Sequence, residues 1–211
     1  MTSTAISAQG SMLQVSSSTG TAVNVTGLAL GYPTIVTGVA HGFKNGDVTT
    51  FAGLGGNTTL NGNQYVVRDV TTNTFAVDAN TTGGAAYTSG GTATPAAWTT
   101  IGNFKTIKGF DGKTAKLDAT NLASTAKEYR AGLQDPGSFT FDVDVDNNDA
   151  GQLALQQYKA NATIANFKLT LPNGHTATFQ GFVEQFPWDG GVDKLVSASV
   201  SIIITGPITY A

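Results

Sequence analysis

Apolar and polar residues alternate with a period of two over much of the chain, which predicts a protein built mainly of β-strands. The alternation is longest in residues 195–205, where aliphatic residues share one face and Ser197, Ser199 and Ser201 share the other. Residues 139–145 alternate in the same way, with aspartates on the polar face. Further strands are expected at residues 34–37, 48–52, 64–70, 74–77, 101–108 and 114–117, and near Tyr87.

Residues 166–183 predict a hairpin whose register follows from the positions of its apolar residues. Pairing Leu171 with His175 places apolar residues opposite one another, whereas a two-residue loop would place them opposite polar ones. The expected cross-strand pairs are Leu169 with Ala177 and Phe167 with Phe179. The resulting three-residue loop requires Gly174 in the left-handed conformation. A second hairpin is expected around the Asp-Gly pair at 111–112.

One amphipathic helix is expected after Asn148 or Asp149, either of which is a good N-cap residue. The helix should end near residues 160–161. Its apolar stripe is expected to consist of Ala150, Leu153, Ala154 and Tyr158. A single helix among many strands indicates a mainly β (α+β) architecture, in which the helix lies on a sheet.

The distribution of charge divides the chain into two parts. Only 12% of the 211 residues are charged, about half the ~25% usual for globular domains. Residues 1–95 contain two basic and three acidic residues, and the other 9 of 11 basic and 11 of 14 acidic residues follow. With Pro95, this shift predicts a boundary near residue 95 and a small all-β module at residues 24–95; the resemblance described below implies that this module is inserted in a main domain of residues 1–23 and 96–211. So weakly charged a surface favours association.

No pattern of catalytic or metal-binding residues is present, so we do not expect an enzyme, a metal site or a cofactor. The chain has no cysteine, and its two histidines have no partner at metal-binding spacing. Residues 142–149 begin like a calcium loop, but Asn147 and Leu153 stand where that loop needs glycine and an acidic ligand. We therefore expect Asp142, Asp144 and Asp146 on the solvent face of a strand. A net charge of −3 gives no basic field for nucleic acid.

The order of motifs in residues 96–211 resembles the tail tube proteins of siphophages, the lambda-like major tail proteins. The motifs occupy residues 98–109, 117–122, 127–137, 179–183 and 205–207, and residues 12–15 resemble the first strand of the family. The predicted module resembles a small β-module common in phage structural proteins, through residues 35–37, 40–43, 45–48, 60–62, 72–75 and 87–91.

This resemblance implies a tail-tube β-sandwich or barrel whose subunits join in hexameric rings, which stack into a tube in the virion tail. The implied partners are further copies of the chain, the tape measure protein, and the tail terminator and distal tail proteins. DNA would pass through the lumen without specific binding. The resemblance also implies that residues 119–136 form a long loop between rings. The residues of this loop expected to stack rings are Lys127, Glu128, Tyr129, Arg130 and Asp135.

An acidic or small polar lumen would let DNA slide, since basic groups bind phosphates. Asp142, Asp144 and Asp146 are therefore expected to face the lumen, although the outer surface or a subunit boundary would also keep them wet. The module is expected to face outward. Residues 1–20 show no secretory signal and no membrane span is visible, so assembly in the bacterial cytoplasm is expected. The alternatives are a glycan- or surface-binding β-protein, with Trp98, Trp188 or Tyr87 stacking on a sugar, and a related secretion-type tube protein.

Overall fold

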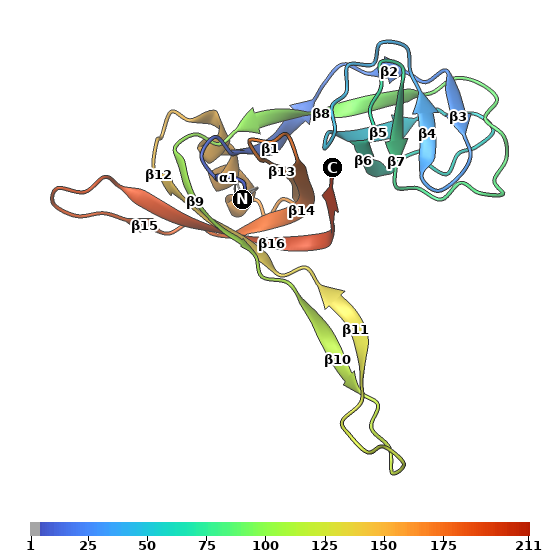
Figure 1. Ribbon diagram of the computed structural model, residues 1–211. Helices are drawn as coiled ribbons and strands as arrows, with labels where there is room; N and C mark the ends of the chain where they lie inside the picture. The colour runs from blue at the N-terminus through green and yellow to red at the C-terminus, as the bar shows by residue number, and fades with distance from the viewer. Residues whose placement is uncertain (1–4) are drawn as a thin grey trace.

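A computed structural model describes residues 5–211 of the chain. It has three parts (Figure 1): a body around one helix, a module of short strands beside it, and a two-stranded arm that extends away from both. Residues 1–4, which belong to the predicted main domain, lie outside the described residues. The mainly β architecture with one helix is confirmed. Among residues 5–211, no helix is long and apolar enough to cross a membrane.

Most strands belong to one antiparallel sheet, in the order β3-β4-β7-β6-β5-β8-β1-β13-β14-β16-β12-β9, with β2 and β15 attached to β8 and β16. The arm is a separate pair of strands, β10 and β11. The strands are β1 (Met12–Thr19), β2 (Val23–Asn24), β3 (Gly27–Ala29), β4 (Thr34–Thr37), β5 (Val48–Ala52), β6 (Gln64–Arg68), β7 (Thr74–Val77), β8 (Thr92–Thr100), β9 (Phe104–Phe110), β10 (Lys113–Asp118), β11 (Tyr129–Asp135), β12 (Ser138–Asp144), β13 (Ala165–Thr170), β14 (Thr176–Gln185), β15 (Trp188–Asp189) and β16 (Ser197–Tyr210). The helix is α1 (Ala150–Ala160).

The body is built on an aromatic core between α1 and the sheet, and its β13–β14 hairpin has the predicted register. Phe167 pairs with Phe179 across the hairpin and Leu169 pairs with Ala177. The ring of Phe179 lies 5.5 Å from that of Phe167 and 5.3 Å from that of Phe139 on β12. Gly174 has the expected positive φ, +88°. Alternation of apolar residues therefore suffices to set the register, because a shift by one residue would expose these rings.

The module has a hydrophobic core of its own, which shares no residue with the core of the body. It is centred on Phe51, Phe75 and Leu60, all essentially fully buried. One strand, β8, continues from the module into the body: Pro95 pairs with Thr49 of β5, and the next residue, Ala96, pairs with Thr19 of β1. Pro95 thus lies inside a strand, and the two parts are connected by a continuous ribbon of β1 and β8.

The prediction of a hairpin around residues 111–112 is wrong, because the strands on either side of this pair do not pair with each other. β9 pairs with β12 and β10 pairs with β11, so β9 and β10 form one edge of a long ribbon and β11 and β12 the other. Asp111 accepts hydrogen bonds from the backbone N–H and the hydroxyl of Ser138. Phe110 packs 5.0 Å from Phe139. These contacts hold β9 against β12, and the chain continues directly into the arm.

The helix begins as predicted, but its buried face is rotated from the predicted one. Asp149 caps it by accepting the backbone N–H of Gln152 at 2.8 Å. Ala154 and Tyr158 of the predicted stripe pack against the core, but Leu153 is 47% exposed, whereas Gly151, Gln152 and Leu155 are buried. A side chain at Gly151 would collide with the backbone of residues 100–101, so only glycine allows the first turn to lie this close to the sheet. This close approach sets the rotation of the helix.

Two further expectations for loops and strands also differ from the structure. Tyr87 lies in a loop, not in a strand, and its hydroxyl hydrogen bonds to the carbonyl of Val25 at 2.9 Å. The strand expected from residue 101 begins at Phe104, because Ile101 is buried and donates its N–H to the carbonyl of Leu13. Both regions are held by contacts distant in sequence, which a local pattern does not reveal.

Candidate assembly surfaces

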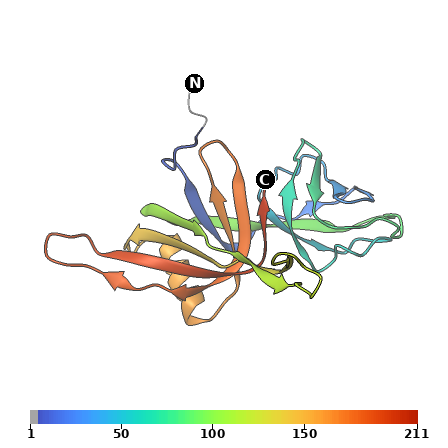
Figure 2. The ribbon, with the colours of Figure 1, turned by 60° about the horizontal axis from the view of Figure 1, so that its bottom comes forward.

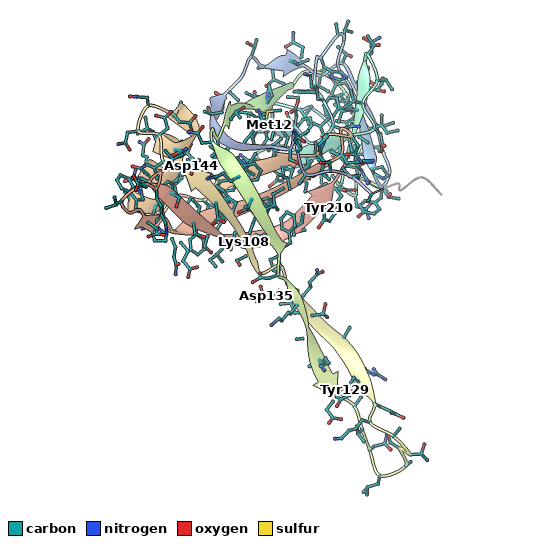
Figure 3. All side chains as sticks on the ribbon, turned by 60° about the vertical axis from the view of Figure 1, so that its left-hand side comes forward. Met12, Lys108, Tyr129, Asp135, Asp144 and Tyr210 are labelled. Carbon is teal, nitrogen blue, oxygen red and sulfur yellow. The ribbon has the colours of Figure 1, made fainter. Side chains whose placement is uncertain are left out.

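The first candidate site is the outer surface of strands β9, β12 and β16, which we call the polar face. On β12 and β16 its residues alternate with buried residues, as the sequence predicts, whereas on β9 the consecutive residues Lys105 and Thr106 both lie on it. The polar face consists of Lys105, Thr106 and Lys108 on β9, Thr140, Asp142 and Asp144 on β12, and Ser197, Ser199 and Ser201 on β16. Cross-strand pairing places Asp142 beside Ser199 and Asp144 beside Ser197. Figure 3 shows Lys108 and Asp144 on this part of the body.

The carboxylates of the polar face are paired with lysines. Lys105 Nζ lies 2.8 Å from Asp144 Oδ1, and Lys108 Nζ lies 2.9 Å from Asp142 Oδ1. The hydroxyl of Thr106 donates to the other oxygen of Asp142 at 2.6 Å. The alternation in the sequence placed Asp142 and Asp144 on a solvent face but did not show that β9 provides a cation for each of these carboxylates of β12.

Asp146 does not lie on the strand face that carries Asp142 and Asp144. β12 ends at Asp144, and Asp146 lies in the turn that leads to α1. Its carboxylate accepts the backbone N–H of Asn148 at 2.9 Å, and its own N–H donates to Gln152 Oε1 at 3.0 Å. The strand periodicity therefore ends one residue earlier than the alternation in the sequence indicates.

Burial raises the pKa of Asp142, but hydrogen bonds from Thr106, Lys108 and Ser199 and the charge of Lys108 outweigh it, so that the pKa lies below its ordinary value of 3.8. A carboxyl group with a lowered pKa stabilises the fold at pH values above its unfolded pKa. This contribution to the stability of the fold is lost as the pH falls through the lowered pKa of Asp142. The carboxylate is therefore ionised at neutral pH and keeps Lys108 paired.

The second candidate site is the arm, which consists of β10, β11 and the connecting residues 119–128. Every residue of β10 is exposed, and Leu133 of β11 is 90% exposed. Its internal contacts are few and lie at the surface: Lys127 Nζ lies 3.0 Å from Asp118 Oδ2, and the ammonium of Lys116 lies 5.4 Å above the ring of Tyr129. A two-stranded ribbon without a core is only marginally stable in water. The arm is therefore held by its backbone ladder, by its continuity with β9 and β12 and by a few surface contacts.

The residues expected to stack rings all lie on this arm, although not all in a loop. Lys127 and Glu128 lie at its far end, whereas Tyr129, Arg130 and Asp135 belong to β11. Figure 3 shows Asp135 where the arm leaves the body and Tyr129 farther out. Of the expected loop of residues 119–136, residues 119–128 connect the two strands of the arm, whereas Tyr129–Asp135 form β11, which pairs with β10.

A third exposed feature is the β15–β16 hairpin, which projects from the body on the side opposite the module (Figures 1 and 2). Trp188 pairs with Ala198 and is 55% exposed, and Val192 and Leu195 beside it are more exposed still. Of the other aromatic residues considered for sugar stacking, Trp98 is partly buried beneath Lys168. Within residues 5–211, no three His, Cys, Asp or Glu side chains come together as metal ligands.

Comparison with known proteins identifies a sequence family and chains of similar structure. The model of the family described as "Phage tail tube protein, TTP" matches residues 55–211, which include the second half of the module. A chain in the cryo-EM structure of the anti-feeding prophage baseplate, 6-fold symmetrised, is similar with a TM-score of 0.47 and 10% sequence identity. The similarity covers 80% of this chain and 94% of that chain. No curated protein matches the chain by sequence.

Proposed function

The chain belongs to the phage tail tube protein family, and from this premise we propose that it assembles with copies of itself into stacked hexameric rings that form a conduit for phage DNA. The family consists of structural proteins of the virion tail and is not a family of enzymes. The hexamer, the stacking and the passage of DNA are the parts that we propose. They rest on the exposed surfaces described above.

The observation that carries the proposal is the arm. It extends from the body without a core, and it exposes large apolar residues such as Leu117, Leu122 and Leu133. A surface on one copy that binds a different surface on the next copy produces a ring or a filament. In our proposal the arm binds the neighbouring ring through Lys127, Glu128, Tyr129, Arg130 and Asp135 and joins rings into a tube.

The open edge of the body sheet supports the closure of each ring. Among residues 5–211, β9 is the last strand of the sheet order and pairs only with β12. Its other side carries backbone donors and acceptors that a further strand could pair with, and native proteins cover or block such edges. We propose that a neighbouring subunit covers this edge in the ring.

We propose that the polar face lines the lumen, with Asp142 and Asp144 on it and Asp146 at its margin. Basic groups bind DNA by replacing counterions at the phosphates. Lys105 and Lys108 already have carboxylate partners at 2.8 and 2.9 Å, so their attraction for phosphates is weakened. The remaining residues of the face are serines and threonines. Such a wall is wet and near neutral, which suits a polyanion that must slide past it.

The proposed organisation has a tube domain of residues 1–23 and 96–211 and an outward-facing module of residues 24–95. Separate hydrophobic cores and the adjacent positions of Thr19 and Ala96 support this division. We further propose that the tube encloses the tape measure protein, ends at the tail terminator and distal tail proteins, and assembles in the cytoplasm of the bacterial host.

Purified full-length chain tests the self-assembly directly. Multi-angle light scattering over a range of concentrations should give species that are multiples of a hexamer, and negative-stain electron microscopy should show rings or tubes. A chain that stays monomeric at high concentration, alone and together with tail components, would contradict the proposal.

A further inference from the structure

The module lies against a polar surface of the body. The face of β13 and β14 that is turned away from the aromatic core consists of Asn166, Lys168, Thr170, Thr176, Thr178 and Gln180. Four of these six side chains are nevertheless buried: Asn166, Lys168, Thr176 and Thr178. Residues 44–47 and Gln64 of the module lie over them, as the hydrogen bonds below show.

Lys168 is the most unusual member of this interface. Its side chain is only 9% exposed, and its ammonium lies 2.8 Å from Asp47 Oδ1 of the module. The same ammonium lies 4.6 Å from the ring centroid of Trp98 on β8. Asp47 uses its second carboxylate oxygen to accept the backbone N–H of Lys44, which fixes the turn that presents it. A buried lysine is costly unless it is paired, so this contact is sensitive to geometry.

The contacts around this ion pair are also polar. Thr178 Oγ1 donates to the carbonyl of Gly46 at 2.9 Å, and Gln64 Oε1 accepts from Asn166 at 3.2 Å and Gln180 at 3.0 Å. Two hollows of about 280 and 500 Å³ flank these contacts. No hydrophobic core crosses the boundary, since the two cores share no residue. Polar interfaces of this kind permit relative motion of the parts they join.

We propose that Lys168 is a positioning residue: its ion pair with Asp47 fixes the orientation of the module on the body. The alternative is that the β1–β8 ribbon alone holds the module. That ribbon has a register shift between Ser16 and Ser18, a local irregularity at which the ladder bends. The charged pair joins module and body outside this ribbon, next to Trp98, which is the cross-strand partner of Ser16, and would oppose rotation about this point. Every copy in an assembly would then present its module in the same direction.

The test measures the distance between module and body in the full-length chain. Because the chain has no cysteine, Thr82→Cys on the module and Lys159→Cys on α1 give two exposed positions for spin labels. Double electron–electron resonance should give one narrow distance distribution in the parent. Lys168→Met should broaden or shift it, whereas Lys168→Arg, which keeps the charge, should preserve it. Lys44→Met, an exposed lysine of the same turn, is the matched control and should leave the distribution narrow.

Asp47→Asn tests the same pair from the module and keeps an oxygen for the turn. It should broaden the distribution like Lys168→Met, and the double variant should show no more broadening than either single variant. Narrow distributions at the parent distance for Lys168→Met or Asp47→Asn would overturn the proposal, as would effects that add in the double variant. Because copies in a ring would add distances between chains, the labelled chain is diluted with unlabelled chain, so that the measured distance is the one within a single chain whether or not rings form.

Discussion

Lys105 and Lys108 reach from β9 to the carboxylates of β12, and this pairing sets the electrostatic character of the polar face. Both lysine side chains are 51% exposed, and exposed ion pairs contribute only about 0–1 kcal/mol to stability. These ion pairs therefore affect the electrostatic field at the polar face more than they affect the stability of the fold. Removing the carboxylates would leave two unpaired cations on the same surface.

The variant Asp142→Asn/Asp144→Asn should fold with a free energy of unfolding within about 1 kcal/mol of the parent, because the pairs are exposed. If the polar face lines the lumen, phages carrying this variant should build normal tails but eject DNA more slowly, which a fluorescence ejection assay measures. Asp78→Asn is the control away from the polar face, since it removes the carboxylate beside Arg68 Nη2 on the module and leaves Arg68 only its longer contact with Asp69. Unchanged ejection in the double variant, with normal tails, would contradict the lumen assignment.

Gln152 has a structural role that its residue type does not suggest. It is fully buried, donates to the carbonyls of Gly102 at 3.1 Å and Asp144 at 2.9 Å, and accepts the N–H of Asp146. Gln152→Leu would leave three backbone groups without this partner and should lower the free energy of unfolding by about 3 kcal/mol. The exposed Gln157→Leu on the same helix should change it by less than about 0.5 kcal/mol. Urea denaturation measures both, and equal effects would contradict this role.

At the scale of the elements, the local sequence pattern predicts those features that depend on residues close together in the chain. The β13–β14 register and the cap at Asp149 follow from the alternation of side chains and the type of a single residue. The face of α1 does not, because it depends on how closely Gly151 approaches the sheet. Nor does the pairing of Lys105 with Asp144, because β9 and β12 meet with two register shifts. Contacts between distant segments determine both.

The sequence predicted the form of the arm least well. The Asp-Gly pair at residues 111–112 is typical of a hairpin turn, but the chain continues through it into the arm. The cross-strand partners Lys113 and Asp135 lie at its base. Replacing residues 114–134 with Asn-Gly would close the ribbon there with a two-residue turn. The shortened chain should keep its stability within about 1 kcal/mol, because the lost residues are exposed.

The shortened chain should also fail to stack, as electron microscopy and sedimentation would show. A second variant, Tyr129→Ala/Leu133→Ala, keeps the ribbon and removes two of its exposed side chains. It should weaken stacking without abolishing the arm. Normal tubes from the shortened chain would contradict the proposed role of the arm.

At the scale of the whole molecule, we propose that the module is an addition to a body that is complete without it. The cross-strand partners Thr19 and Ala96 mark where the chain leaves and re-enters the body. The surface that the module covers is polar, so its exposure to water would not uncover a hydrophobic core. The sequence predicted a boundary near residue 95 from composition. It could not predict that one strand crosses that boundary.

Joining Thr19 to Ala96 through Asn-Gly, in place of residues 20–95, should give a body that folds and still assembles into tubes of smaller outer diameter. Circular dichroism checks the fold and electron microscopy checks the tubes. The parent chain, purified in parallel, is the control. A soluble, folded product that no longer forms tubes would show that the module belongs to the tube wall.

Cryo-electron microscopy of tubes formed by the full-length chain tests the central claim most directly, because it locates all three parts at once. We predict rings of six chains, the polar face with Asp142 and Asp144 around a continuous lumen, the arm in contact with the next ring, and the module outside. A reconstruction with the polar face on the outer surface, or with the arm free of neighbouring rings, would contradict this assignment.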